Sequence, residues 1–379
     1  MIFFQHYWWF LVSLLGAILV FLLFVQGGQT LLFSLPKTAN ERTLLVNALG
    51  RKWELTFTTL VTFGGAAFAS FPLFYSTSFG GAYWLWIAIL FSFVIQAVGY
   101  EFRNKAGNLL GQKTYECFLL CNGLFSTILL GVAVAMFFNG AAFTMEKVNI
   151  TNTVHPVISS WTTAWHGLEA LVQPFNLLLG LVVFFLARTL GLLFVMYQLD
   201  HEALTQRARK QLLLNAALFV VLFVVFVLWL FLKTGYQVNP DSGVISAQSN
   251  KYFFNMIAVP WLGILLLAGV VLVLYGLVRA LFFNPRCAFW ITGVGVVLAV
   301  LSLLLCAAFN NTAYLISTVN PQQSLTLYNS SSSLFTLKAM SIVSLFIPAV
   351  LAYITYVWYS LSKTKLTEAE FTEKGNIVY

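Results

Sequence analysis

The sequence predicts an all-α, polytopic membrane protein, and three observations support this fold class. Hydrophobic residues make up 60% of the 379-residue chain and charged residues only 8%, whereas an ordinary soluble domain has roughly 25% charged residues. The apolar residues form long runs, and the lysines and arginines gather in alternate connections between these runs. Twelve acidic and twenty basic residues cannot cover a soluble globule of this size. Soluble enzymes, disordered chains and disulfide-built scaffolds are therefore excluded.

Nine apolar runs approach or exceed the roughly 20 residues that a helix needs to cross a bilayer. They cover residues 7–25, 55–75, 83–100, 115–138, 167–199, 212–232, 256–281, 287–309 and 335–361. These runs are too long and too uniformly apolar for barrel strands, and helices satisfy the backbone polar groups inside lipid. We expect about nine transmembrane helices in a single integral membrane domain, residues 1–379, that ends in a short cytoplasmic tail, residues 362–379.

The distribution of basic residues predicts the orientation. Fifteen of the twenty lysines and arginines lie in alternate connections and in the tail. Because positively charged connections stay in the cytoplasm, we expect the N-terminus outside and the C-terminus inside, which an odd number of spans also requires. The net charge of +8 forms no single basic patch, so nucleic acid is not an expected partner.

Charges at the edge of the hydrocarbon are candidate functional residues because it is costly to hold them there. Glu54 follows Trp53 at the cytoplasmic entrance of the second span and precedes a stretch rich in threonine. A carboxylate at this depth can load a proton and pass it to hydroxyl groups or water. The alternative is a helix N-terminal carboxylate that is stabilised by the helix dipole and Lys52.

Two further charged groups require partners. Glu101 ends the third span next to Arg103 and Lys105, and an ion pair at the membrane surface is the expected role. Arg188 lies within the fifth run, where it should find a carboxylate, carbonyl groups or a polar cofactor head, or extend its side chain to the surface.

Small residues in the second span predict close helix packing. Gly64 and Gly65 begin a stretch of small side chains that allows another helix or a partner subunit to approach. Pro72 should kink or end this span. Gly80 and Gly81 then make a short turn, which predicts an antiparallel hairpin of the second and third spans.

The histidines and cysteines do not form a metal-binding pattern. All four histidines lie at span ends or in connections, and Cys117 and Cys121 have no supporting histidine or second cysteine pair. We expect no metal ligand, no haem and no catalytic residue in this chain alone, and interpret the cysteines as small buried side chains.

Several ordered blocks resemble subunit II of the cytochrome bd quinol oxidases, and the resemblance covers the whole chain. The blocks are Trp53-Glu54, residues 63–75, 79–83, 99–105 and 324–337, and Pro348 with Tyr353 downstream. The last block includes the serine run 330–333, which otherwise suggests a linker or a helix cap.

The resemblance implies a fold, a partner and cofactors. The fold would be two four-helix bundles and one peripheral helix. Subunit I would carry two haems b and one haem d, and subunit II would bind none, with room for a structural quinone. The complex, which in some cases includes a small accessory subunit, would oxidise quinol in the bacterial cytoplasmic (inner) membrane, reduce dioxygen to water and take up protons from the cytoplasm. The second and third spans would contact subunit I.

In this family, the position of Trp53-Glu54 is typically Trp-Asp, and the aspartate is assigned to a proton path towards the haems. The resemblance therefore implies a proton-path role for Glu54, with Trp53 beside it. Two departures limit the comparison. Well-known members have Asp-Gly-x-Asp where this chain has Gln26-Gly27-Gly28-Gln29, and neither amide can titrate. Family members also have a tryptophan soon after this pair that lines a proposed route for dioxygen. This chain has Thr59 near that position instead, so we do not expect a dioxygen path through it.

Two competing functions remain open at this point. A multi-pass solute transporter would also have many spans and a charged residue within one, although no internal repeat of the kind common in transporters is evident. A purely structural scaffold would use Glu54 only to stabilise a helix end. A co-purified partner that contains haem would exclude the transporter. The effect of Glu54→Gln on oxygen consumption tests the structural scaffold.

Overall fold

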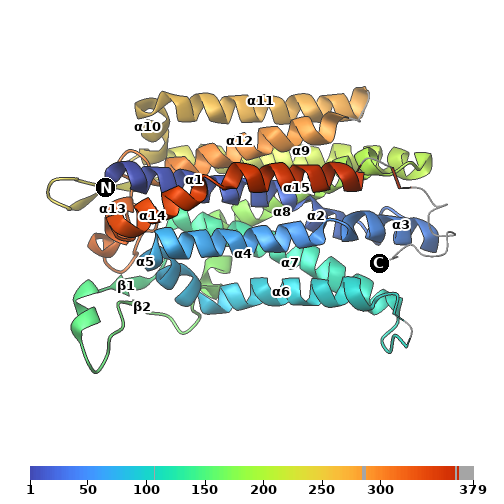
Figure 1. Cartoon of the computed structure of the whole chain (residues 1–379). Coiled ribbons are helices and arrows are strands. Elements are labelled where there is room, and N and C mark those ends of the chain that lie inside the picture. Colours follow the sequence, from blue (N-terminus) through green and yellow to red (C-terminus); the bar gives the residue numbers. More distant parts are fainter. Residues whose placement is uncertain (106, 284–286, 363–364, 367–379) are drawn as a thin grey trace.

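A computed structural model describes residues 1–105, 107–283, 287–362 and 365–366. Its long helices run nearly parallel to one another and form one elongated body (Figure 1). Most of the predicted tail 362–379 lies outside the described residues. Of that tail, Ser362 ends the last helix, and Leu366 pairs through its backbone with Gln198 and Asp200.

Seven helices in the described part of the chain are long and apolar enough to cross a membrane. They are α1 (Ile2–Leu22) with its continuation α2 (Phe24–Gln29), α6 (Tyr83–Phe102), α7 (Gln112–Asn139), α8 (Pro174–Gln198), α9 (Glu202–Leu232), α11 (Pro260–Phe282) and α12 (Ala288–Ala308). An eighth candidate is a pair bent by 41°, α14 (Leu334–Ser344) with α15 (Ile347–Ser362). The mostly helical membrane fold is confirmed. The count of nine, the orientation and the division into two bundles with a peripheral helix stay predictions.

The predicted second span, residues 55–75, is helical but is not among these candidates. It forms α4 (Trp53–Ser70), whose threonines, glycines and Glu54 lower its mean hydropathy. The helix ends before Pro72, which begins the short helix α5 (Pro72–Tyr75). A π-helical turn at Ser76–Gly80 then leads into α6. Pro72 therefore ends this helix, as predicted, because a proline ring excludes the preceding turn of an α-helix.

Prolines also explain where other predicted runs begin or break. The predicted run 256–281 is divided into α10 (Lys251–Ala258) and α11, which starts at Pro260. Pro174 starts α8, although the apolar run begins at residue 167. Pro348 is the second residue of α15, just after the bend. Proline is favoured in the first helical turn, where its missing N–H costs no hydrogen bond.

The connections near the N-terminal end of α1 are ordered (Figure 1). Antiparallel strands β1 (Phe143–Met145) and β2 (Ser159–Trp161) form one hairpin, and β3 (Gly235–Val238) and β4 (Ile245–Gln248) form another. Short 3-10 turns and one further short helix complete these connections, at Lys147–Thr151, Leu168–Val172, Pro321–Gln323 and α13 (Leu327–Ser330).

Two helix caps fix the ends of the bundle. Ser333 accepts a hydrogen bond from the backbone N–H of Thr336 and caps α14, which confirms the helix-cap interpretation of the serine run. At the opposite end of the body, α3 (Ala39–Gly50) begins with a capping box formed by Thr38 and Glu41. Each cap satisfies N–H groups that would otherwise lack a partner.

The centre of the body is α8, which packs against α2, α7, α9 and α12. The contact with α2 depends on glycine. A Cβ atom at Gly27 would lie 1.8 Å from the carbonyl oxygen of Ala187, and one at Gly191 would lie 2.5 Å from the amide nitrogen of Gly28. Only glycines permit this approach, which places the 26–29 segment inside the protein.

Candidate functional site

One face of α4 is open along its length and carries Glu54 at its start. Glu54, Thr58 and Thr62 are all exposed and follow one another at four-residue intervals, so they form a row on one helix face, which we call the α4 row. The Thr58 hydroxyl donates to the Glu54 carbonyl and the Thr62 hydroxyl to the Thr58 carbonyl, each at 2.7 Å. Both hydroxyl oxygens keep acceptor capacity. The row therefore combines a titratable carboxylate with oxygens about 6 Å apart along the helix.

The Glu54 carboxylate makes no hydrogen bond or ion pair with any of the described residues. Its neighbour Trp53 turns towards the protein instead, where its indole stacks on Tyr100 of α6 with ring centroids 5.8 Å apart. The Tyr100 hydroxyl accepts a hydrogen bond from Gln29 at 3.0 Å. Trp53 thus fixes the start of α4 against α6 and α2, while Glu54 faces away from the bundle.

The two glycines predicted for partner packing have different surroundings. A Cβ atom at Gly65 would meet nothing within 4 Å, and Pro72 is also exposed. Gly64 is buried, and a Cβ there would lie 3.7 Å from the ring of Phe79, within ordinary contact distance. The chain's own aromatic residue covers Gly64, and its role in partner packing stays a prediction. Gly65 and Pro72 remain on the open face of α4.

Near the start of α7, the predicted surface charges separate into two systems. Glu101 pairs with Lys105 at 2.8 Å, and both side chains are more than half exposed. Arg103 instead points inward and pairs with Glu116 at 2.9 Å. Arg42 of α3 reaches the other oxygen of the same carboxylate at 3.2 Å. Glu101 and Lys105 thus form an ordinary surface pair, whereas Glu116 joins two guanidinium groups inside the protein.

Arg188 obtains its partners from neutral groups. Its Nε donates to the Asn215 side chain at 2.8 Å, and its Nη1 donates to the Thr30 hydroxyl at 2.9 Å and to the Thr30 carbonyl at 3.3 Å. The guanidinium also lies 5.6 Å from the ring centre of Phe184. Carbonyl and amide partners therefore satisfy Arg188, which clamps α8 to α2 and α9.

The structure contains a group of buried amides, of which Gln96 and Asn122 were missed by sequence reasoning and the burial of Gln26 and Gln29 was not predicted. Gln26, Gln29, Gln96 and Asn122 are fully or almost fully buried, and each keeps at least one side-chain atom without a hydrogen-bond partner in the described part of the chain. Such groups are usually satisfied by ordered water. They can hold water inside the body but cannot titrate. Their sequence signal was present, because glutamine and asparagine interrupt apolar runs in α2, α6 and α7.

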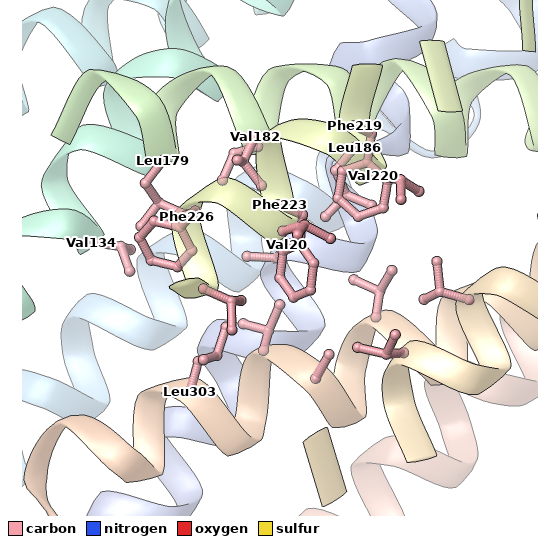
Figure 2. Close-up of a pocket in the computed structure, with 18 of the residues that line it drawn as sticks. Val20, Val134, Leu179, Val182, Leu186, Phe219, Val220, Phe223, Phe226 and Leu303 are labelled. Carbon is pink, nitrogen blue, oxygen red and sulfur yellow. The ribbon is translucent and has the colours of Figure 1, made fainter. Parts of the chain in front are cut away.

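The bundle also contains an apolar cavity of about 310 Å³ between α1, α7, α8, α9, α11 and α12. Figure 2 shows its wall, where Val20, Leu179, Phe223 and Leu303 come from four different helices. Its lining consists of valine, leucine, phenylalanine and alanine. The cavity can accept hydrocarbon but supplies no hydrogen-bond donor from these side chains.

Three of the histidines already have structural contacts. His201 accepts the Leu204 backbone N–H at the start of α9, His166 contacts the Gly81 carbonyl, and His6 contacts the Ile2 carbonyl. Within the described ranges, no group of three or more His, Cys, Asp or Glu side chains is arranged to hold a metal ion.

Comparisons with known proteins cover almost the whole chain. The family model "Cytochrome bd terminal oxidase subunit II" matches residues 4–361. The chain is 26% identical to a probable cytochrome oxidase subunit 2 of Haemophilus influenzae, with 98% of this chain and 97% of that protein covered. It is 24% identical to the cytochrome bd-I ubiquinol oxidase subunit 2 of Escherichia coli, with 93% of both chains covered.

A solved structure has the same fold. A chain of the bd oxidase from Geobacillus thermodenitrificans superposes with a TM-score of 0.64 at 15% identity, over 94% of this chain and 97% of that one. The family match, the similarity to the curated relatives and the fold therefore agree. The chain belongs to the cytochrome bd terminal oxidase subunit II family.

Proposed function

We propose that this chain is subunit II of a cytochrome bd-type complex that oxidises quinol and reduces dioxygen to water. The observation that carries the proposal is the family match over residues 4–361. Relatives named as ubiquinol oxidase subunits match over 93% and 94% of this chain. The protein is a multi-pass protein of the bacterial inner membrane.

The partner is subunit I, and the open face of α4 is the surface that we assign to it. Gly65, Phe68 and Pro72 are exposed on this face, and α6 beside it exposes Trp84 and Phe91. An apolar surface with a glycine notch suits a second helix bundle. A small accessory subunit stays a prediction.

We assign the haems to subunit I. The histidines of this chain lie near helix ends or in connections, and three of them make backbone contacts; this arrangement does not resemble a pair of axial ligands within a bundle. In the complex the haems would supply electron transfer and dioxygen reduction. This chain would hold the partner and help to deliver protons.

Glu54 is the residue that we assign to proton delivery. Its carboxylate lies exposed at the start of α4 and makes no hydrogen bond or ion pair with the described residues. Trp53 would position it through the contact with Tyr100. Gln26 and Gln29, which stand where well-known members have acidic residues, cannot titrate, so we assign the proton-carrying role to Glu54.

The structural quinone stays a prediction. The apolar cavity in Figure 2 suits an isoprenoid tail and offers no side-chain donor for a quinone carbonyl. A quinone held here would therefore place its head group outside this cavity.

Affinity purification separates the proposal from a transporter. The tagged chain, extracted in mild detergent from its native membrane, should bring a second large polypeptide and a reduced-minus-oxidised haem spectrum with a long-wavelength haem d band. A chain isolated alone and without haem would refute the assignment to an oxidase.

A further inference from the structure

A second, larger cavity lies between α15 and the rest of the protein, which α15 contacts through Trp358. It has a volume of about 1090 Å³ and lies between α15 and the side chains of α1, α4 and α12. Figure 1 shows α15 running in nearly the same direction as α1 and α4. We call this space the α15 groove.

The walls that α1 and α4 contribute are short. The lining runs from Leu15 to Leu22 on α1 and from Leu55 to Thr62 on α4. Eight helical residues rise about 12 Å, somewhat less than half of a hydrocarbon core of about 30 Å. The bundle side of the groove therefore has the depth of one lipid leaflet, which fits an acyl chain better than a membrane-spanning helix.

One end of the groove is polar and basic, whereas the remainder is mostly apolar. Lys365, Ser362 and Tyr359 line this end together with the aromatic rings of Trp290 and Trp358. Tryptophan and tyrosine favour the level of lipid head groups. The apolar lining and the basic end together match the two parts of a phospholipid.

The basic end contains two lysines, of which only Lys365 has a carboxylate partner among the described residues. Asp200 lies 3.7 Å from Lys365. Lys52 places its Nζ 4.5 Å from the ring centre of Trp358, is only 2% exposed, and has no hydrogen-bond acceptor among the described residues. Burial, with a smaller contribution from Arg51, lowers the pKa of Lys52 to about 8. This is the behaviour of a buried ammonium group that lacks a counter-ion.

The threonines in the groove do not require a polar ligand. The hydroxyl groups of Thr58, Thr59 and Thr62 each donate to a backbone carbonyl one turn earlier in α4. Their methyl groups can therefore contact hydrocarbon without leaving a donor unsatisfied.

We infer that the α15 groove holds one anionic phospholipid, with its phosphate beside Lys365 and Ser362 and an acyl chain between α15 and the walls of α1 and α4. Thr58 and Thr62 of the α4 row also line this groove, so the lipid would cover that part of α4, while Gly65, Phe68 and Pro72 further along the helix stay available to subunit I. The inference requires only a membrane-embedded chain, so it does not depend on the proposed function.

Photolabelling of the purified complex tests this inference. The probe is phosphatidylglycerol with a diazirine in its acyl chain, presented in phosphatidylcholine nanodiscs. We expect label on peptides of α15 and α4, and a phosphatidylcholine probe should label these peptides less. Lys365→Gln should lower groove labelling about fivefold, the effect of one lysine near a lipid surface. The matched control is Lys113→Gln, which removes an exposed lysine outside the groove.

Two further variants separate loss of the site from loss of the fold. Lys52→Met keeps an aliphatic side chain against Trp358 and removes the positive charge. The amount of haem that co-purifies with this variant shows whether the complex still assembles. Ile354→Trp fills the groove and should abolish labelling without a change in charge. If the phosphatidylglycerol and phosphatidylcholine probes label the groove equally and Lys365→Gln does not change the labelling, the groove holds ordinary boundary lipid. This result would overturn the inference. Absence of label from α15 and α4 in the unmodified complex would mean that subunit I fills the groove, and would overturn it equally.

Discussion

Arg103 and Glu116 form a buried ion pair at the junction of α6 and α7, with 2.9 Å between Nη2 and Oε1 and side chains only 2% and 3% exposed. A second hydrogen bond from Arg103 Nε to the same oxygen measures 3.1 Å. Arg42 approaches the other oxygen from α3. A single carboxylate therefore holds three helices together at this end of the bundle.

The first prediction concerns this junction. Glu116→Gln leaves Arg103 buried without a counter-charge, and breaking a buried pair from one side typically costs about 3–5 kcal/mol. Thermal unfolding of the purified complex, followed by tryptophan fluorescence, should show a clear loss of stability. The double variant Arg103→Met with Glu116→Leu should recover much of it. An unchanged midpoint in Glu116→Gln would mean that the pair contributes little.

Acid should weaken the contact between α3 and α9. Burial alone would raise the pKa of Glu41, but Arg207 and the backbone N–H groups of Lys37 and Thr38 bind its carboxylate and lower the pKa to about 2, from an ordinary value of 4.5. Because the folded-state pKa is depressed, the stabilisation is complete above about pH 4.5 and disappears as the pH falls towards 2.

Thermal unfolding of the wild type and Glu41→Gln between pH 2 and pH 7 measures this effect. The difference between the two proteins should be largest near neutrality and shrink below pH 4.5. A difference that is independent of pH would contradict a role for the Glu41 charge.

Glu54→Gln should slow oxygen consumption by the purified complex. The amide cannot carry a proton. A positioned proton-transfer group typically raises a reaction rate at least about a hundredfold, so we expect turnover to fall by about that factor. Glu54→Asp should keep most of the activity. The control is Glu101→Gln, which removes another exposed carboxylate, one that is paired with Lys105. If the Glu54→Gln complex has its full haem content and consumes oxygen at the normal rate at every pH, Glu54 is not needed for proton delivery. Its role would then be that of a carboxylate that stabilises a helix end.

Gly65→Leu should impair assembly without unfolding the chain. The added side chain meets nothing within 4 Å of its Cβ in this protein, but it would fill the notch on the α4 face, and overpacking typically costs about 1–3 kcal/mol. The expected result is a lower yield of haem-bearing partner in affinity purification. Gly263→Leu on α11, where the added Cβ has only ordinary contacts, should not change this yield. Equal partner recovery from both variants would place subunit I elsewhere.

Much of the fold followed from the sequence because membrane helices are long and apolar. The proline at residue 72 and the serine run at 330–333 also had the predicted effects, since helix ends depend on local chemistry. The second span was the weakest case. α4 is helical but only moderately hydropathic, because one of its faces carries Glu54 and threonines instead of hydrocarbon.

The candidate site was less predictable because it depends on contacts between distant segments. Glu116 was missed, although a carboxylate in an apolar run signals a buried function or pairing. Its partners Arg42 and Arg103 come from two other elements, and no local pattern connects them. The sequence also could not tell that Gly64 faces Phe79 while Gly65 stays open, because this depends on the path of the turn after Pro72.

Quinol-driven oxygen consumption by the complex purified through this chain tests the assignment most directly. The preparation should oxidise two quinols for each dioxygen reduced to two waters, and the activity should disappear when this chain is omitted from co-expression with its partner. A preparation that contains the chain and its partner but consumes no oxygen with quinol would contradict the assignment.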